Sequence, residues 1–361
     1  MTGKIAFFLG SDVPASTQTL FTNLTNKISD HFEIDFVGFY GDKKFGDHVN
    51  EVIYDYPSHK GINRMYCASR TIKRYDKEHD PDLIFLAHKH TVYSVSLLLS
   101  ADLSKTIIRI NGDTFNLYKD KTWETRVNRA KTYFINNILS PINFKNSLGI
   151  VVQTEYMFDE FKKRGFDPEK IKILPLPIDT DRFKEVNQDK KDEIRESLNI
   201  DKEKTIALIV GTASKKKRQN LLEKILDSED SLKDIIFLII GESVYGKKLD
   251  KRYKNVRYEG FVDHDQIHRY YQAGDFLLHF AVNEGLPTVF QEASACNLPI
   301  IARKANYNST LDICRFDTVE ELKKMLEDEI WKTADTHVTP GLSKDEYIEF
   351  FDNMIERKKQ R

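Results

Sequence analysis

Short, continuous apolar runs recur along the chain, separated by longer stretches in which apolar and polar residues mix. Runs of this length without strict alternation are typical of strands buried on both faces of a parallel sheet. In the first half they are Lys4–Leu9, Ile34–Phe39, Leu83–Ala87, Thr106–Ile110 and Gly149–Val152. In the second half they are Thr205–Val210, Ile235–Ile240, Val256–Phe261, Phe276–Phe280 and Pro299–Ala302. Two successive sets of strand and helix predict an α/β chain with two doubly wound, Rossmann-like domains.

A proline-containing stretch separates the two sets of strands. Residues 173–183 include Pro175 and Pro177 and show no helical period. Proline fixes its own backbone and restricts the residue before it, so this stretch is expected to be extended. We therefore expect an N-terminal domain over residues 1–176 and a C-terminal domain over residues 177–340.

The last residues of the chain have the pattern of a separate helix. Ser343 and Glu346 have the spacing of a capping box, which marks a helix start. Apolar residues follow at helical spacing and form one stripe, namely Tyr347, Phe350, Phe351 and Met354. We expect residues 341–361 to form a helix that crosses back onto the first domain. The alternative is a helix that covers the second domain only.

Length and composition restrict the class of protein. The chain has 361 residues and a formal net charge of −1, so no global field draws it to nucleic acid. Its cysteines, Cys67, Cys296 and Cys314, show no metal-site spacing and predict reduced thiols in a cytoplasmic protein. The first strand begins almost at once, which leaves no room for a signal peptide. No apolar run approaches the ~20 residues of a membrane span.

The most informative stretch is N-E-G-L-P-T-V-F-Q-E-A-S-A-C-N-L-P, residues 283–299. Glu284 lies before a turn, and Glu292 lies inside the helix expected after it. Pro287 suits the first helical position, which places Thr288 and Glu292 on one helix face. A helix start offers free backbone N–H groups to an anion. A phosphate with polyol groups on either side fits this arrangement, and a nucleotide sugar is such a ligand.

The pattern E-G-L-P followed by E-A-S-A-C-N-L-P resembles the E-x7-E signature of retaining glycosyltransferases of the GT-B fold, in family 4. The resemblance implies two Rossmann-like domains that face a central cleft. It also implies that Glu284 acts catalytically on the donor sugar and that Glu292 holds the ribose hydroxyls. The turn residues would contact the donor diphosphate and sugar, and they are Gly285, Leu286, Pro287 and Thr288.

The stretch after Val210 resembles the family's diphosphate-binding segment. Lys217 falls on the family lysine, Thr212 replaces the family arginine, and Arg218 is a candidate substitute for that arginine. A desolvated diphosphate requires cations and many donors, although a solvated basic loop is the alternative interpretation. Gly211 before this segment and Gly241 at the next strand end resemble glycines that permit close backbone approach to the nucleotide.

The first domain resembles the family more loosely. Ser16 and Thr17 stand where the family often has a Gly-Gly pair and are expected to contact the donor. Asn111 stands where a histidine commonly reaches the donor sugar, and Asn cannot titrate near neutral pH. His88 follows an earlier strand and is a candidate for a catalytic role near the acceptor. The resemblance implies no metal site, and no cofactor other than the nucleotide diphosphate sugar.

The region 121–140 is a candidate for a partner surface. Trp123, Tyr133 and Phe134 are interleaved with arginines and lysines, and such a helix can lie on an anionic membrane. The alternative is an amphipathic helix packed on its own sheet. We expect a cytoplasmic protein with either no membrane contact or a peripheral contact at the cytoplasmic face.

The resemblance predicts a metal-independent, retaining, hexosyltransferase-type enzyme. It would move a sugar from a nucleotide diphosphate sugar to a hydroxyl acceptor, either a glycan or a lipid-linked glycan. Thr212 and Asn111, which depart from the family pattern, keep a non-catalytic GT-B subunit that binds a nucleotide or glycan as an alternative. Another GT-B enzyme, such as a nucleotide-sugar epimerase, is a third candidate.

Overall fold

The computed structural model describes residues 3–10, 15–39, 45–56, 62–87, 96–97, 99–119, 126–212, 220–227 and 232–360. The chain divides into two compact units. The first combines Met1–Pro177 with Gly341–Arg361, and the second is the continuous segment Ile178–Pro340. The chain therefore leaves the first unit once and returns to it for its last residues.

The first unit is built on a parallel sheet with the strand order β3-β2-β1-β4-β5-β6-β7. Its strands are β1 (Lys4–Gly10), β2 (Glu33–Phe39), β3 (Asn50–Tyr54), β4 (Leu83–Leu86), β5 (Thr106–Arg109), β6 (Gly149–Val152) and β7 (Ile171–Ile173). The order reverses between β1 and β4, which pair directly. Ligands of doubly wound sheets bind at such a reversal, beyond the carboxyl ends of the strands.

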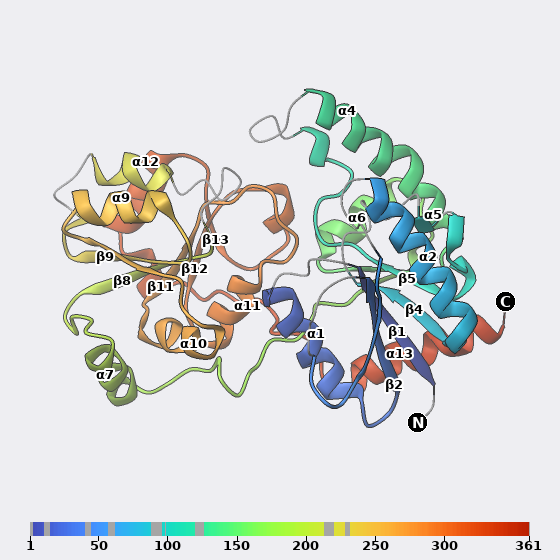
Figure 1. Ribbon diagram of the computed structural model, residues 1–361. Helices are drawn as coiled ribbons and strands as arrows, with labels where there is room; N and C mark the ends of the chain where they lie inside the picture. Colours follow the sequence, from blue (N-terminus) through green and yellow to red (C-terminus); the bar gives the residue numbers. More distant parts are fainter. Residues whose placement is uncertain are drawn as a thin grey trace. The chain divides into compact units, whose positions relative to one another are not determined.

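Helices cover both faces of this sheet (Figure 1). They are α1 (Ala15–Ile28), α2 (Ile62–His79), α4 (Arg126–Phe134), the π-helical segment η3 (Ile135–Leu139), α5 (Ser140–Asn146), α6 (Glu155–Lys163) and α13 (Lys344–Lys359). Short 3-10 turns are η1 (Leu103–Lys105), η2 (Leu117–Lys119) and η4 (Pro168–Lys170). Ile5 and Phe7 of β1 enter the core shared with α1 and α13, whereas Phe8 enters the core shared with α2. The continuous apolar run of β1 is thus explained by burial of both faces.

The second unit repeats this architecture with the strand order β10-β9-β8-β11-β12-β13. Its strands are β8 (Thr205–Val210), β9 (Ile235–Ile240), β10 (Val256–Gly260), β11 (Phe276–His279), β12 (Ile300–Arg303) and β13 (Cys314–Phe316). Its helices are α7 (Gln188–Ser197), α8 (Leu221–Leu226), α9 (Val244–Arg252), α10 (His264–Ala273), α11 (Thr288–Ala295), α12 (Val319–Glu327), η6 (Asn306–Asn308) and η7 (Ile330–Lys332). The reversal here lies between β8 and β11, which pair in parallel.

The last helix, α13, belongs to the first unit and lies beside its sheet (Figure 1). The capping box predicted at its start is present, with Ser343 N–H donating to Glu346 Oε2 over 2.9 Å. Tyr347 and Phe351 are fully buried in the core with β1 and α1. The Tyr347 hydroxyl donates to the carbonyl of Pro175 over 2.5 Å. This bond connects α13 to the end of the segment Met1–Pro177, after which the chain enters the second unit.

The structure confirms the two predicted doubly wound units, and every apolar run marked in the sequence lies on a strand. Three strands were not predicted, namely β3, β7 and β13, and each lies at an edge of its sheet. Among the helices of the described residues, none combines the length and apolarity needed to cross a bilayer.

Candidate functional site

The turn after β11 and the helix α11 bring the sequence motif together in the second unit. Gly285, Leu286 and Pro287 are buried, and Glu284 just before them is half-buried. Pro287 is the N-cap of α11 and the helix begins at Thr288, so Pro287 does not occupy the predicted first helical position. Its extended ψ of 126° explains the difference, because the chain turns into the helix only after the proline.

Glu292 lies one turn inside α11 and is buried, with 5% of its surface exposed. Its Oε2 accepts a hydrogen bond of 2.6 Å from the Tyr271 hydroxyl of α10. Its Oε1 lies 3.8 Å from Nε2 of His264, at the start of α10. The ring of Phe183 packs edge-on against both Tyr271 and His264.

Burial controls the protonation of this group. Removal from water raises the pKa of Glu292 to about 7, and the hydrogen bond from Tyr271 opposes that shift. Burial and the neighbouring carboxylate raise the pKa of Tyr271 well above 10, so it stays a donor. Burial lowers the pKa of His264, which favours its neutral form. A carboxyl that titrates near neutral pH in a buried setting is typical of a functional site.

Glycines form the carboxyl edge of the sheet beside α11. Gly211 and Gly241 follow β8 and β9, and Gly260 is the last residue of β10. Their φ angles are 124°, 116° and 74°, which residues with side chains rarely adopt. A Cβ on Gly241 would lie 2.7 Å from the carbonyl carbon of Gly211. The two backbones therefore touch, and the strand ends present main chain rather than side chains, as a phosphate-binding edge requires.

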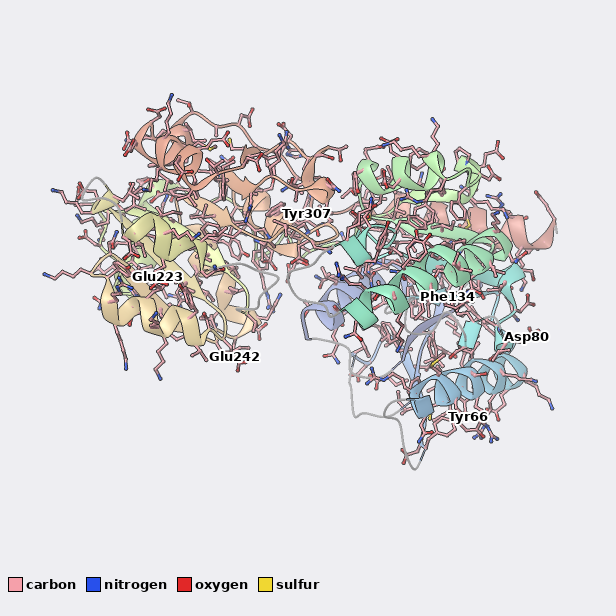
Figure 2. The ribbon with its side chains drawn as sticks, turned by 90° about the horizontal axis from the view of Figure 1, so that it is seen from above. Tyr66, Asp80, Phe134, Glu223, Glu242 and Tyr307 are labelled. Carbon is pink, nitrogen blue, oxygen red and sulfur yellow. The ribbon has the colours of Figure 1, made fainter. Side chains whose placement is uncertain are left out.

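A buried tyrosine anchors the loop that carries Glu284. Tyr307, on η6 after β12, donates its hydroxyl to the carbonyl of Ala281 over 3.2 Å. The Glu284 charge contributes, after burial, to raising the pKa of Tyr307, which indicates that the two groups are close. Figure 2 marks Tyr307 within the second unit. This anchor could not be predicted, because no local spacing in the sequence links Tyr307 to the motif.

In the first unit, Asn111 follows β5 and its amide oxygen accepts a hydrogen bond from Arg109. Arg109 is buried and donates to the Ala87 carbonyl over 3.2 Å. Its guanidinium carbon lies 5.5 Å from the Phe21 ring centre. Burial lowers the pKa of this guanidinium. Arg109 was not predicted to belong to the site, because an arginine at the end of an apolar run usually marks the exposed end of a strand.

The remaining predicted residues divide between described and undescribed parts of the chain. Ser16 and Thr17 lie in the first turn of α1, and Thr17 is half-buried. His88, Lys217 and Arg218 lie outside the described residues. Within the described residues, no three or more metal-type side chains converge on one point.

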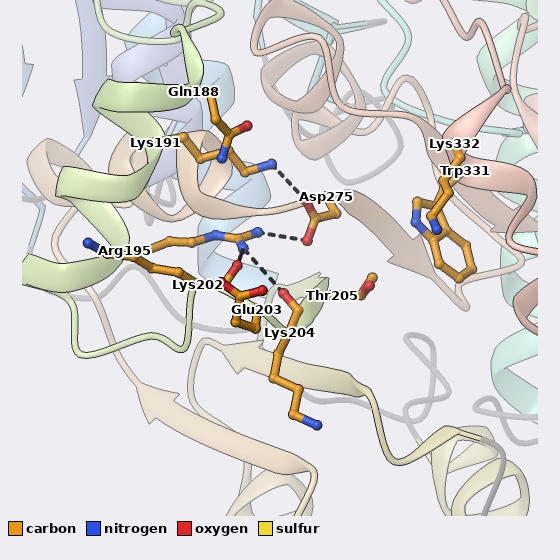
Figure 3. Close-up of a pocket in the computed structure, with 10 residues that line it drawn as sticks. All are labelled: Gln188, Lys191, Arg195, Lys202, Glu203, Lys204, Thr205, Asp275, Trp331 and Lys332. Atoms are coloured by element: carbon orange, nitrogen blue, oxygen red, sulfur yellow. Dashed lines mark hydrogen bonds and ion pairs between the residues drawn. The ribbon is translucent and has the colours of Figure 1, made fainter.

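A cavity of about 390 Å³ lies at the opposite end of the second sheet (Figure 3). Thr205 and Asp275 line it at the amino ends of β8 and β11. Asp275 binds Arg195 and Lys191 at 2.7 Å each, as the dashed lines show. These ion pairs neutralise the charges that line the cavity and connect α7 to the sheet. Because the cavity lies at the amino ends of the strands, it is distinct from the carboxyl edge of the sheet near Glu292.

The surface of α4, η3 and α5 exposes large apolar side chains. Tyr133, Phe134, Ile138 and Ile142 are 44–52% exposed, and Figure 2 marks Phe134 on α4. Phe134, Ile138 and Ile142 are spaced four apart and form one stripe. One face of this stretch packs inward, with Phe144 in the core of the sheet, as the alternative of an amphipathic helix packed on its own sheet expects, and the other face exposes the apolar stripe.

Two family models match the chain in succession. The Glycosyltransferase Family 4 model matches residues 18–182, mainly in the first unit, and the model of Glycosyl transferases group 1 matches residues 190–311 in the second. The second match contains both Glu284 and Glu292. Together the two matches support a group 1, family 4-like glycosyltransferase.

Sequence relatives include the alpha-monoglucosyldiacylglycerol synthase of Acholeplasma laidlawii, 27% identical over 64% of this chain and 62% of that protein. The putative teichuronic acid biosynthesis glycosyltransferase TuaC of Bacillus subtilis is 29% identical over 46% of this chain and 42% of that protein. The matches thus span about two fifths to three fifths of these relatives.

Solved structures share the fold over nearly the whole chain. HepE of Anabaena, in complex with UDP and glucose, has a TM-score of 0.65 at 14% identity, covering 99% of this chain and 98% of its own. Sucrose-phosphate synthase of Thermosynechococcus elongatus has a TM-score of 0.70 at 15% identity, with the same coverage. At these identities the likeness supports the GT-B fold alone.

Proposed function

We propose that this protein is a retaining glycosyltransferase that moves a sugar from a nucleoside diphosphate sugar to a hydroxyl acceptor, without a metal ion. Glu292 would accept hydrogen bonds from the ribose, and Glu284 would address the sugar. The main chain from Gly285 to Thr288 would receive the diphosphate at the positive end of α11. The two family matches, together with the complex that Anabaena HepE forms with UDP and glucose, support this donor class.

The observation that carries the proposal is the buried carboxyl of Glu292. Burying a carboxylate costs free energy unless it is paired, and here the described partner is a neutral tyrosine hydroxyl. A polar ligand with hydroxyl donors would supply further partners. At the carboxyl ends of β8 and β9, Gly211 and Gly241 lie in direct backbone contact, and such an edge offers main chain rather than side chains to a phosphate.

Alanine variants of Glu284 and Lys217 should lose different properties, sugar transfer in the first and nucleotide binding in the second. Glu284→Ala should spare binding of free nucleoside diphosphate and lower transfer by ~10²–10³, as expected for one preorganised group. Lys217→Ala should weaken the free nucleotide and the donor alike, since both carry the diphosphate. Nucleotide calorimetry and a nucleotide-release assay with UDP-, GDP- and ADP-sugars separate these roles. Transfer by Glu284→Ala at the wild-type rate would refute the assignment.

A non-catalytic subunit is the second candidate function, because Asn111 cannot act as a titrating group and already accepts a hydrogen bond from Arg109. The two candidate functions predict opposite results with the wild-type protein. Nucleotide binding with no release of nucleotide from any donor, across glycan and lipid-linked acceptors, would favour the subunit. Anomeric analysis of any product decides whether transfer proceeds with retention.

We further propose that the acceptor is lipid-linked and that the stripe of Phe134, Ile138 and Ile142 rests on a membrane surface. Residues 126–146 carry Arg126, Arg129, Lys131 and Lys145 and no acidic residue, which suits an anionic surface. The names of the synthase of A. laidlawii and of the yeast phosphatidylinositol N-acetylglucosaminyltransferase GPI3 subunit both include a lipid.

Vesicle sedimentation tests the membrane surface. Binding to vesicles with 30 mol% phosphatidylglycerol should exceed binding to pure phosphatidylcholine and should weaken as salt rises. Phe134→Ser with Ile138→Ser should lower the partition coefficient by roughly tenfold, because each large apolar side chain contributes ~1.5–3 kcal/mol when fully buried and only part of it enters the interface. Ile53→Ser, which alters an equally exposed isoleucine on β3, is the matched control. Equal loss in both variants would contradict the assignment.

A further inference from the structure

Tyr271 hydrogen-bonds Glu292, the carboxylate proposed to bind the ribose, although Tyr271 lies outside the sequence motif. Its hydroxyl lies 2.6 Å from Glu292 Oε2. We propose that Tyr271 is a positioning residue that holds Oε2 of Glu292, so that Oε1 is presented to the nucleotide ribose. This inference rests on the proposed function, since it concerns how the same carboxylate binds its ligand.

The tyrosine is a rigid donor. It is completely buried, and the Phe183 ring packs edge-on against it with centroids 5.5 Å apart. A phenol has a single proton to donate, and that proton is committed to Oε2. The carboxylate is thereby fixed at one oxygen, which restricts rotation of the Glu292 side chain about its last bond. A preorganised acceptor loses less entropy when a ligand binds.

The second oxygen is placed differently. The Oε1 atom lies 3.8 Å from the nearest nitrogen of His264, beyond the range of a hydrogen bond. Among the described side chains, only Tyr271 donates a hydrogen bond to Glu292. Tyr271 thus holds Oε2, whereas Oε1 can accept a hydrogen bond from a ribose hydroxyl.

The same bond sets the charge of the carboxyl. Donation from Tyr271 lowers the pKa of Glu292 against the effect of burial and so favours the ionised, stronger acceptor. The other titratable neighbours are neutral at pH 7. Burial lowers the pKa of His264. Burial also raises the pKa of Cys296, the C-cap residue of α11, to about 12. On β11, His279 faces the Phe290 ring instead.

The test is the affinity for free nucleotide between pH 6 and 9, measured by calorimetry with UDP, GDP and ADP on the full chain. Wild-type affinity should rise as pH passes through about 7. Tyr271→Phe should bind about tenfold more weakly at pH 7, the loss that corresponds to about 1.4 kcal/mol, and its profile should shift to higher pH. Tyr270→Phe, one residue away on the same helix, should match the wild type.

A double-mutant cycle separates positioning from a structural role. Glu292→Gln removes the titration and gives the baseline for the nucleotide's own phosphate. In that background Tyr271→Phe should change the affinity less than twofold, because no carboxylate remains to be held. The double variant also leaves no charge buried, so it keeps the test available if the single variant does not fold.

The outcomes distinguish the two proposals. Tyr271→Phe with wild-type affinity and an unshifted pH profile would overturn the positioning role and leave the proposed function standing. An equal loss on adding Tyr271→Phe to the wild type and to Glu292→Gln would likewise overturn it, as a packing effect. A wild-type protein that binds none of the three nucleotides would overturn the proposed function and this inference with it.

Discussion

At the scale of single residues, Glu292 couples the chemistry of the site to the stability of the fold. Burial raises its pKa from 4.5 to about 7, so between these values the folded chain keeps a proton that the unfolded chain releases. Stability therefore falls as pH rises through this window and stays low above it. A buried carboxyl that lowers the folding stability is usually retained for a function. We propose that the function of Glu292 is to bind the ligand.

Glu292→Gln should stabilise the protein at high pH and not at low pH. Glutamine keeps the shape and an acceptor for Tyr271 but cannot ionise. The difference between 4.5 and about 7 corresponds to on the order of 3 kcal/mol above pH 7.5, and almost none at pH 4.5. Urea unfolding at both pH values measures it. A variant less stable than the wild type at pH 8 would show that the carboxylate is paired and favourable in the folded state.

The sequence predicted local features of the site better than tertiary ones. The spacing of Glu284, Pro287 and Glu292 marks a turn and a helix, and the structure has both, with the start shifted by one residue. Tyr271 and Tyr307 could not be assigned in this way, because their partners lie 21 and 26 residues away in the chain. Only the packing of α10 and η6 brings them together with the motif.

At the scale of elements, burial decides which strands a sequence reveals. Inner strands such as β8 are covered on both faces and need unbroken apolar runs. The edge strand β3 is exposed at most of its positions, and β7 and β13 are only three residues long. Such strands pair on one side and carry polar residues without penalty, so hydrophobic pattern alone does not identify them.

The glycine pair at the ends of β8 and β9 gives a test at this scale. Gly241→Ala would strain a φ of 116° and drive a Cβ to 2.7 Å from the Gly211 carbonyl carbon. Gly165→Ala is a matched control, since its φ is 75° and nothing lies within 4 Å of the added Cβ. The control should lose ~1 kcal/mol of unfolding free energy, and Gly241→Ala at least ~2 kcal/mol more. Equal losses would mean that the backbones separate easily.

At the scale of the whole molecule, the two units differ in continuity. Residues 178–340 form the second unit in one stretch, whereas the first needs residues 341–361 to complete it. The reason is a set of aromatic contacts, in which Phe351 of α13 lies 5.9–6.0 Å from Phe7, Phe32 and Phe85. These rings belong to the core that α1 and the sheet share.

We therefore expect the two units to respond differently to truncation. Residues 178–340 alone should unfold cooperatively and keep their affinity for nucleoside diphosphate, because the described parts of the Glu292 group lie within them. Residues 1–177 alone should expose the rings that Phe351 covers and should bind hydrophobic dye, as incompletely packed cores do. Adding residues 341–361 as a separate peptide should restore cooperative unfolding, whereas the same peptide with Phe351→Ala should restore it less, by the ~3–5 kcal/mol that a buried phenylalanine contributes. A stable, dye-free fragment 1–177 would show that α13 covers a unit that is already complete.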